Sequence, residues 1–298
     1  MDGNFTEALK IAIGESLAEG KQVILFQNRR GYAPFLLCTT CGTIPHCKQC
    51  DVSLTYHRNQ DKLTCHYCGT RYPYVHTCAA CGSPTLEPKS FGTEKIEDDL
   101  QVAFPEARIA RMDVDAIRNK DSHNKLIQLL EERSIDILVG TQMVVKGLDF
   151  ENVNLVGILS ADNLLGFPDF RVNERAFQLM EQVSGRAGRK HGTGKVLIQA
   201  ANTRHPVLHY VIAHDYKAMY EAEIAERQAF GYPPFFRLLK LTIRHKNQQV
   251  AEQAAQILAS WLQPHIGAQL VGPAAPLVAR VRNNYLQEML IKLPREAR

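Results

Sequence analysis

The cysteines of this 298-residue chain constrain its fold more than any other feature, because all eight lie between residues 38 and 81. They form four Cys-x-x-Cys pairs, which are Cys38/Cys41, Cys47/Cys50, Cys65/Cys68 and Cys78/Cys81. Two intervening residues allow one tight turn to direct both thiolates of a pair at the same metal ion. Eight thiolates are what two tetrahedral four-cysteine sites require, so the spacing predicts two structural Zn²⁺ ions.

Two other uses of these cysteines fit the sequence less well. Disulfide bonds suit secreted chains, but this chain has no signal peptide and an intracellular type of composition. A thioredoxin-like redox motif needs one such pair rather than four. All-thiolate sites leave no coordination position open, so we expect the zinc ions to be structural rather than catalytic.

The order of the pairs favours a nested arrangement of the two zinc sites. The two inner pairs flank a short alternating stretch, a polar turn and a second short stretch, which is typical of a zinc-ribbon hairpin. The outer pairs would then close the base of the insert. The expected ligand sets are Cys38, Cys41, Cys78 and Cys81, and Cys47, Cys50, Cys65 and Cys68. Sequential pairing of neighbouring pairs is the alternative.

Length and charge narrow the function classes only a little. A chain of this length has room for about two domains. No apolar run approaches the roughly 20 residues that a membrane-spanning helix needs, so we expect no membrane association. The net charge is only +4, so any nucleic-acid contact must come from a local basic surface. The abrupt ends favour a piece of a longer protein.

Strand-like and helix-like segments alternate along most of the chain. Short apolar runs predict strands over residues 22–26, 108–113, 135–139, 154–159 and 195–199. Helical periodicity or context predicts helices over residues 5–19, 91–104, 124–132 and 175–183. This alternation predicts an α/β fold with a RecA-like parallel sheet, interrupted by the cysteine-rich insert.

The C-terminal part of the chain has a different pattern. Residues 208–230 predict one long helix, and a small α+β domain follows, with strands at 238–244, 268–272, 278–282 and 288–292 and a helix at 248–262. Trp261 falls at an apolar spacing on that helix and is expected in the core. The expected domains are 1–37 with 89–204 (RecA-like sheet domain), 38–88 (zinc insert), 205–235 (helical connection) and 236–298 (α+β domain, expected to be truncated).

The segment 182–189, Gln-Val-Ser-Gly-Arg-Ala-Gly-Arg, carries the strongest catalytic pattern. It follows a predicted helix and precedes a glycine-rich turn and a strand. Arg186 and Arg189, three residues apart, could stabilise the charge that develops on a transferring γ-phosphoryl group. Gln182 and Gly185 would fit closely against a phosphate. A surface arginine pair is the alternative, but the complete string argues against it.

Three segments resemble motifs of the superfamily 2 helicases. Residues 182–189 resemble motif VI, residues 138–150 resemble motif V, and residues 91–95 resemble the motif that precedes it. With four cysteine pairs inserted after residues 28–32, the chain resembles the bacterial replication-restart helicases over nearly its whole length. This resemblance implies part of an ATP-dependent 3′–5′ DNA helicase that recognises stalled or D-loop forks and initiates primosome assembly.

The resemblance also implies roles for single residues. Arg186 and Arg189, supported by Gln182 and Gly185, would contact ATP phosphates across the cleft between two lobes, with Arg189 as the arginine finger. Motif V would supply residues that line the nucleotide cleft, namely Gly147 and Asp149. Its first residues would touch the DNA backbone, namely Thr141 and Gln142. For Thr141 taken alone, an ordinary helix N-cap is the alternative.

Arginines beside aromatic residues mark further candidates for DNA contact. Arg29, Arg30 and Tyr32 follow the first strand, where α/β sheets place ligand loops. Others are Arg71, Tyr72, Tyr74, Arg237, Lys240, Arg244, Arg280, Arg282 and Tyr285. Charge and stacking suit single-stranded DNA, although for each residue alone a solvated basic face is the favoured interpretation. The carboxylates of Asp113 and Asp115 could suggest a metal, but we expect a solvated turn.

The chain departs from the helicase pattern in one respect. It has no Gly-x-x-x-x-Gly-Lys-Thr loop and no Asp-Glu-x-His box, and residues 191–195 lack the spacing and context of a phosphate loop. ATP and Mg²⁺ would therefore be bound largely by a separate first lobe, and we expect this chain alone to be inactive as an ATPase. The resemblance implies a monomer in the bacterial cytoplasm that binds forked and single-stranded DNA, primosome proteins and single-strand-binding protein. A non-enzymatic zinc-ribbon module that binds nucleic acid or protein is the alternative.

Overall fold

The computed structural model describes residues 4–27, 35–57, 61–89, 93–113, 120–141, 151–166, 169–188 and 194–295. The chain divides into two compact units. The first comprises Met1–Tyr32 and Ser90–Glu223, and the second comprises Ala33–Lys89 and Ile224–Arg298. Within the described ranges, no helix is long and apolar enough to cross a membrane.

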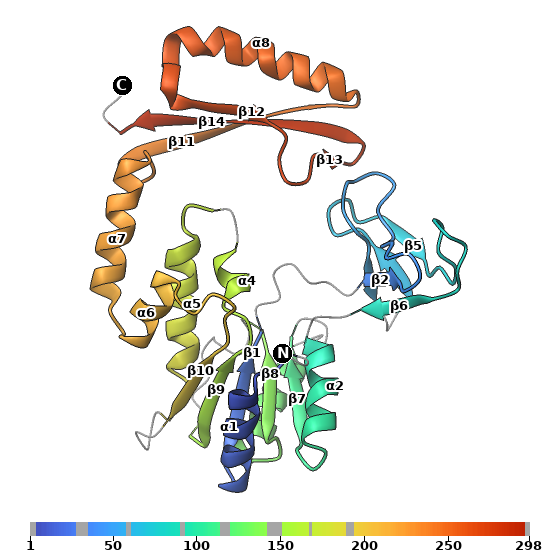
Figure 1. The fold of residues 1–298 in the computed structure, drawn as a ribbon, viewed down its shortest axis with the longest axis vertical. Coiled ribbons are helices and arrows are strands. Elements are labelled where there is room, and N and C mark those ends of the chain that lie inside the picture. Colours follow the sequence, from blue (N-terminus) through green and yellow to red (C-terminus); the bar gives the residue numbers. More distant parts are fainter. Residues whose placement is uncertain are drawn as a thin grey trace. The chain divides into compact units, whose positions relative to one another are not determined.

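The first unit contains a five-stranded parallel sheet with the order β10-β9-β1-β8-β7 (Figure 1). The strands are β1 (Gln22–Phe26), β7 (Ile109–Met112), β8 (Ile137–Gly140), β9 (Val153–Ile158) and β10 (Lys195–Ile198). Every residue of the central strand β1 is buried, as expected for a parallel strand covered on both faces. The predicted parallel α/β sheet is therefore confirmed.

Helices cover both faces of this sheet. Alternate residues of β1 point in opposite directions, so Val23 and Leu25 join one core and Ile24 and Phe26 the other. The first core includes residues of α1 (Glu7–Ala18) and α2 (Thr93–Ala103). The second includes residues of α3 (Lys120–Glu131), α4 (Asp162–Leu165), α5 (Val172–Ser184), α6 (Pro206–Ile212) and α7 (Tyr216–Ala229).

The single long helix expected over residues 208–230 is wrong, because the chain forms two helices there, α6 and α7. Between them His214 has a φ of 52°, a left-handed conformation that an α-helix cannot continue through. The Asp215 carboxylate then accepts a hydrogen bond from the Ala218 N–H at 2.9 Å. This side chain satisfies a free N–H in the first turn of α7 and so starts a new helix.

In the second unit, the cysteine-rich segment forms two small antiparallel sheets. Strand β2 (Phe35–Cys38) pairs with β6 (Leu86–Lys89), so the first and last strands of the insert are neighbours. The other sheet has the order β3-β4-β5 and consists of β3 (Thr55–His57), β4 (Lys62–Thr64) and β5 (Arg71–Pro73). The β3–β4 hairpin is the one that the alternating sequence predicted.

The rest of the second unit is the predicted small α+β domain. Its sheet has the order β11-β14-β12, and β13 pairs with β14. The elements are β11 (Phe236–His245), α8 (Gln248–Ile266), a 3-10 turn (Gly267–Gln269), β12 (Leu270–Ala274), β13 (Arg280–Val281) and β14 (Asn284–Pro294). Helix α8 crosses from β11 to β12, as the sequence pattern indicated.

The expectation that Trp261 lies in the core is wrong, because its side chain is 66% exposed. The buried face of α8 consists of Ala251, Ala255 and Ala259, which repeat every four residues. Trp261 is two positions beyond Ala259, which rotates it by about 200° around the helix axis. Its ring instead makes an edge contact with His265, with the ring centroids 5.8 Å apart.

Candidate functional site

The structure gathers the eight cysteine sulfurs into two groups of four. Cys38, Cys41, Cys78 and Cys81 form the outer cluster, and Cys47, Cys50, Cys65 and Cys68 form the inner cluster. Within each cluster all ligand atoms lie within 4.8 Å of one another. This is the nested arrangement, in which the first pair meets the last pair and the two middle pairs meet each other.

The separations between the sulfurs fit tetrahedral zinc. A Zn–S distance of 2.3 Å implies that sulfurs at the corners of the tetrahedron lie about 3.8 Å apart. The Sγ–Sγ distances are 3.6 Å for Cys38 and Cys81, and 3.6 Å for Cys41 and Cys78. In the inner cluster, Cys47 and Cys68 are 3.7 Å apart. The geometry and the all-thiol donor set thus support structural zinc at both clusters.

The same backbone turn occurs at all four Cys-x-x-Cys pairs and positions their sulfurs for zinc binding. In every pair the N–H of the first cysteine donates to the carbonyl oxygen five residues later, at 2.8–3.0 Å. In three of the pairs a glycine follows the second cysteine, and Gly42, Gly69 and Gly82 have φ values of 73°, 78° and 71°. Only glycine adopts this left-handed conformation without steric cost. The Cys-x-x-Cys-Gly string was therefore a sequence signal for the turn as well as for the ligands.

The two clusters differ in burial. In the inner cluster Cys47, Cys50 and Cys65 are buried, whereas Cys41 and Cys81 of the outer cluster are exposed. Burial raises the pKa of the Cys50 thiol to about 12. A zinc ion deprotonates its thiol ligands outright, so its binding at either cluster releases protons.

At the carboxyl edge of the parallel sheet, the structure places Thr141 and Asp113. Thr141 follows β8 and is buried, and its N–H donates to the Met112 carbonyl oxygen at 3.2 Å. Asp113 follows β7 and accepts a hydrogen bond from the hydroxyl of Thr93, the first residue of α2. Asp113 is only 1% exposed, so the solvated turn expected there is wrong for this residue. Asp115 lies outside the described residues.

Arg186 lies at the opposite, amino edge of the sheet. Helix α5 ends at Ser184, and the turn after it returns to the sheet, where the Gly188 N–H donates to the Val153 carbonyl oxygen at 3.0 Å. Val153 is the first residue of β9. Gly194 packs against this turn so closely that a Cβ atom there would lie 2.4 Å from the Ala187 carbonyl carbon. Arg186 is therefore held on a tightly packed turn.

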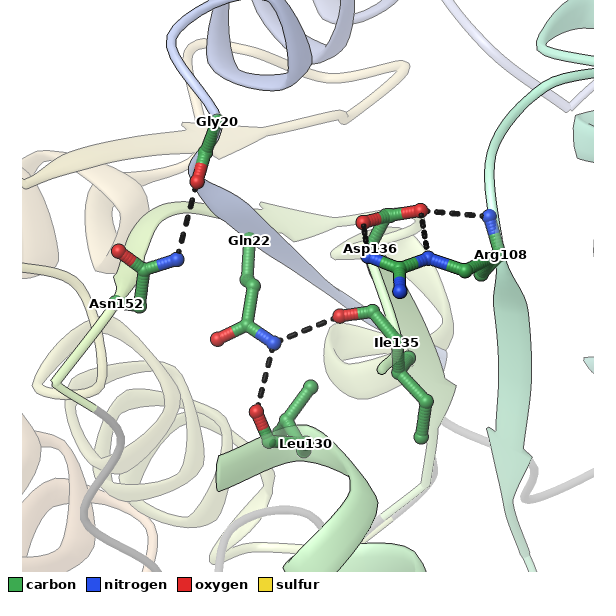
Figure 2. Close-up of polar contacts among 7 residues, drawn as sticks. All are labelled: Gly20, Gln22, Arg108, Leu130, Ile135, Asp136 and Asn152. Atoms are coloured by element: carbon green, nitrogen blue, oxygen red, sulfur yellow. Dashed lines mark hydrogen bonds and ion pairs between the residues drawn. The ribbon is translucent and has the colours of Figure 1, made fainter. Parts of the chain in front are cut away.

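A polar network at the same edge fixes the ends of neighbouring strands (Figure 2). The buried amide of Gln22 donates to the carbonyl oxygens of Leu130 and Ile135 at 2.8 and 2.7 Å. Arg108 donates to both carboxylate oxygens of Asp136, at 2.9 and 2.6 Å. Arg108 thereby holds the pKa of the Asp136 carboxyl below its ordinary value. These contacts join residues at the amino ends of β1, β7 and β8.

The structure describes four of the residues that the helicase motifs assigned to nucleotide or DNA. It brings Arg186 and Gly185 together at the end of α5, with Gln182 exposed on its last turn, and places Thr141 at the other edge of the sheet. Seven further candidates lie outside the described residues, namely Arg29, Arg30, Tyr32, Gln142, Gly147, Asp149 and Arg189. Their roles stay predictions.

Three family models match successive parts of the chain. Residues 47–73 match the PriA DNA helicase Cys-rich region domain. Residues 91–191 match the helicase conserved C-terminal domain, and residues 228–298 match the primosomal protein N C-terminal domain. These matches coincide with the inner zinc cluster, the parallel sheet and the α+β domain.

Two curated relatives are both described as replication restart protein PriA. The protein of Bacillus subtilis (strain 168) is 42% identical over 98% of this chain and 36% of its own length. The protein of Treponema pallidum (strain Nichols) is 41% identical over 92% of this chain and 42% of its own length. This chain thus spans well under half the length of either relative. Among solved structures, the Hef helicase domain of Pyrococcus furiosus superposes with a TM-score of 0.34 at 16% identity, over 70% of this chain and 28% of that one.

Proposed function

This chain belongs to the family of the replication restart protein PriA, and on that premise we propose that it is the second motor lobe, zinc insert and C-terminal domain of an ATP-dependent DNA helicase. The resemblance to replication-restart helicases expected from the motifs is confirmed by these relatives. The proposal adds the activity: translocation 3′ to 5′ along DNA, driven by ATP hydrolysis in a site completed by a separate first lobe.

The observation that carries the proposal is the placement of Thr141 and Arg186 at opposite edges of one sheet. Strand β9, whose six residues span about 20 Å, separates the two edges. In the sequence, the segment that resembles motif V, residues 138–150, connects β8 to β9. A motor lobe needs such a link between a nucleotide-facing edge and a DNA-facing edge, since hydrolysis at one must alter the grip at the other.

In the proposed mechanism, closure of the first lobe onto this one brings ATP to the Arg186 turn. Arg186 and Arg189 stabilise the negative charge that develops on the γ-phosphoryl group, while Gln182 and Gly185 shape its surroundings. A magnesium ion held mainly by the first lobe would neutralise phosphate charge. Gly147 and Asp149 line the nucleotide cleft, and Thr141 and Gln142 hold the DNA backbone.

The wider assignment follows from the same family membership. We propose that the full protein recognises forked and single-stranded DNA and initiates primosome assembly with single-strand-binding protein and other primosome proteins, as a monomer in the bacterial cytoplasm. Arg29, Arg30 and Tyr32 would add DNA contacts. The domain boundaries at residues 38–88, 205–235 and 236–298 are part of this proposal.

Arg186→Ala in the full-length protein tests the motor role. We expect DNA-stimulated ATP turnover to fall by about 10³-fold or more, the usual effect of removing an arginine that stabilises the transferring phosphoryl group. Zinc content should stay at two ions per chain. Arg175→Ala is the matched control, because Arg175 lies at the other end of α5 and pairs with Asp169 at 2.7 Å. Normal turnover by the Arg186 variant would refute the proposed role of Arg186 in the motor.

The 298-residue chain offers a second test. Single-strand-stimulated ATP hydrolysis should be absent while the same sample contains two zinc ions. Turnover that disappears with Arg189→Ala would show that this chain holds a phosphate-binding site of its own, and the two-lobe proposal would fail.

A further inference from the structure

One hairpin of the C-terminal domain contacts the zinc insert within the second unit. The hairpin joins β13 to β14 through Arg282 and Asn283, whose φ values of 51° and 59° are both left-handed. Such a two-residue turn matches the twist of the strands that it joins. Arginine rarely adopts this conformation, so the surroundings of the turn must hold it there.

The surroundings are the turn of the inner zinc cluster. The Arg282 N–H donates to the Cys50 sulfur at 3.2 Å, and the Asn283 N–H donates to the Gln49 carbonyl oxygen at 2.8 Å. In the reverse direction, the Asp51 N–H donates to the Arg280 carbonyl oxygen at 3.0 Å. Three consecutive residues of the insert thus bind the hairpin, Gln49 and Asp51 through backbone groups and Cys50 through its sulfur.

Side chains strengthen the same contact. The Arg280 guanidinium donates to the Asp51 carboxylate at 2.9 Å, and Asp51 holds the pKa of Arg280 above its ordinary value. Val281 packs against the buried cluster that contains the inner cysteines. The contact therefore combines an ion pair, backbone hydrogen bonds and an apolar residue around one metal ligand.

The zinc ion is expected to control this contact because it controls Cys50. A zinc-bound cysteine is a thiolate, and hydrogen bonds to a charged acceptor are stronger than those to a neutral one. Hydrogen bonds to ligand atoms also orient the ligands and tune metal affinity. The zinc ion holds the turn from Cys47 to Cys50 in the shape that places residues 49–51 against the hairpin, together with the hydrogen bond from the Cys47 N–H to the Val52 carbonyl oxygen.

We propose that the inner zinc ion acts as a latch that fastens the C-terminal domain to the zinc insert. While the ion is bound, the β13–β14 turn stays docked on residues 49–51, and loss of the ion releases it. The outer cluster, whose Cys41 sulfur bonds instead to Thr43 at 3.1 Å within the insert, holds no part of the latch. This proposal goes beyond the proposed function and does not depend on helicase activity.

Hydrogen exchange on the 298-residue chain tests the latch, with zinc measured on the same samples. Cys50→Ser should remove one zinc ion and raise exchange in residues 281–286 by about tenfold or more. Cys41→Ser should also remove one zinc ion but leave exchange there within about twofold. Equal exchange in the two variants would overturn the proposal.

Asp51→Ala tests the contact without touching a ligand. The variant should keep both zinc ions and have a lower zinc affinity at the inner cluster. Hydrogen exchange in residues 281–286 should rise about three- to fivefold, because one ion pair is lost. Glu87→Ala, which changes an exposed acidic residue of β6 in the same insert, is the matched control and should change neither quantity. Unchanged exchange and zinc affinity in the Asp51 variant would overturn the proposal even if Cys50→Ser does not fold.

Discussion

Replacing Gln22 by leucine should destabilise the parallel sheet measurably. Gln22 is 3% exposed, and its amide donates to the carbonyl oxygens of Leu130 and Ile135. The Leu130 oxygen also accepts from the Arg133 N–H at 3.1 Å, so it keeps one partner after the substitution. The Ile135 oxygen loses the amide, and a buried carbonyl oxygen that loses its hydrogen bond costs about 1–3 kcal/mol.

We therefore expect Gln22→Leu to lower the free energy of unfolding of the first unit by about 2 kcal/mol, since leucine has nearly the volume of glutamine and leaves no large cavity. The assay is hydrogen exchange of the slowest amides in β1 and β8, which should accelerate about 30-fold. A global unfolding curve would mix the two units and is less suitable.

Gln128→Leu is the matched control. Gln128 lies on the exposed side of α3, where its amide donates to the Glu132 carboxylate at 2.7 Å. The same substitution there should change stability by less than about 0.5 kcal/mol. If exchange in β1 changes less than twofold in the Gln22 variant, the two carbonyl oxygens do not depend on its amide and the reasoning is refuted.

Three further predictions follow from the structure. Gly157→Ala should destabilise the first unit by about 1–3 kcal/mol in the same exchange assay, because the added Cβ would lie 2.7 Å from Leu25 Cδ2. Unchanged exchange would mean that the core around Gly157 can accommodate a methyl group. The Asp136 pKa is lowered by Arg108, so the pair's contribution, about 1 kcal/mol or less, should be present above pH 4 and disappear as the pH falls below it. The exchange protection of β7 and β8 in wild type and Asp136→Asn should therefore differ at pH 6, and the difference should shrink as the pH falls below 4; a constant difference would contradict this. Removing both zinc ions with a chelator should abolish protection from hydrogen exchange in residues 35–89, while the parallel sheet should stay protected. Retained protection in residues 35–89 would show that the insert folds without zinc.

The sequence predicted those parts of the fold that depend on local pattern. The strand predicted over residues 22–26 matches β1 residue for residue. A short apolar run that follows the helix-ending Gly20 is typical of a buried strand. The cysteine spacing predicted both clusters, and their nested grouping followed the order of the pairs. The helix predicted over residues 175–183 lies within α5, and Arg186 follows its end, while the role of Arg186 stays a prediction.

What the sequence did not predict depends on tertiary contacts. The break between α6 and α7 contains no glycine or proline, so only the His214 backbone and the Asp215 cap reveal it. The buried state of Asp113 depends on Thr93, which lies 20 residues away in the sequence. The hairpin contact on Cys50 joins residues more than 200 apart, and no local pattern could have indicated it.

The pairing of β2 with β6 has an evolutionary consequence. Phe35 and Lys89 are partners in the antiparallel register, so the two ends of the cysteine-rich segment lie about 5 Å apart. An ancestral loop of a few residues between β1 and α2 could have acquired the whole cysteine-rich segment in one event without displacing any strand of the sheet. Replacing residues 35–89 by a short glycine linker should reverse that acquisition and leave a foldable five-stranded lobe.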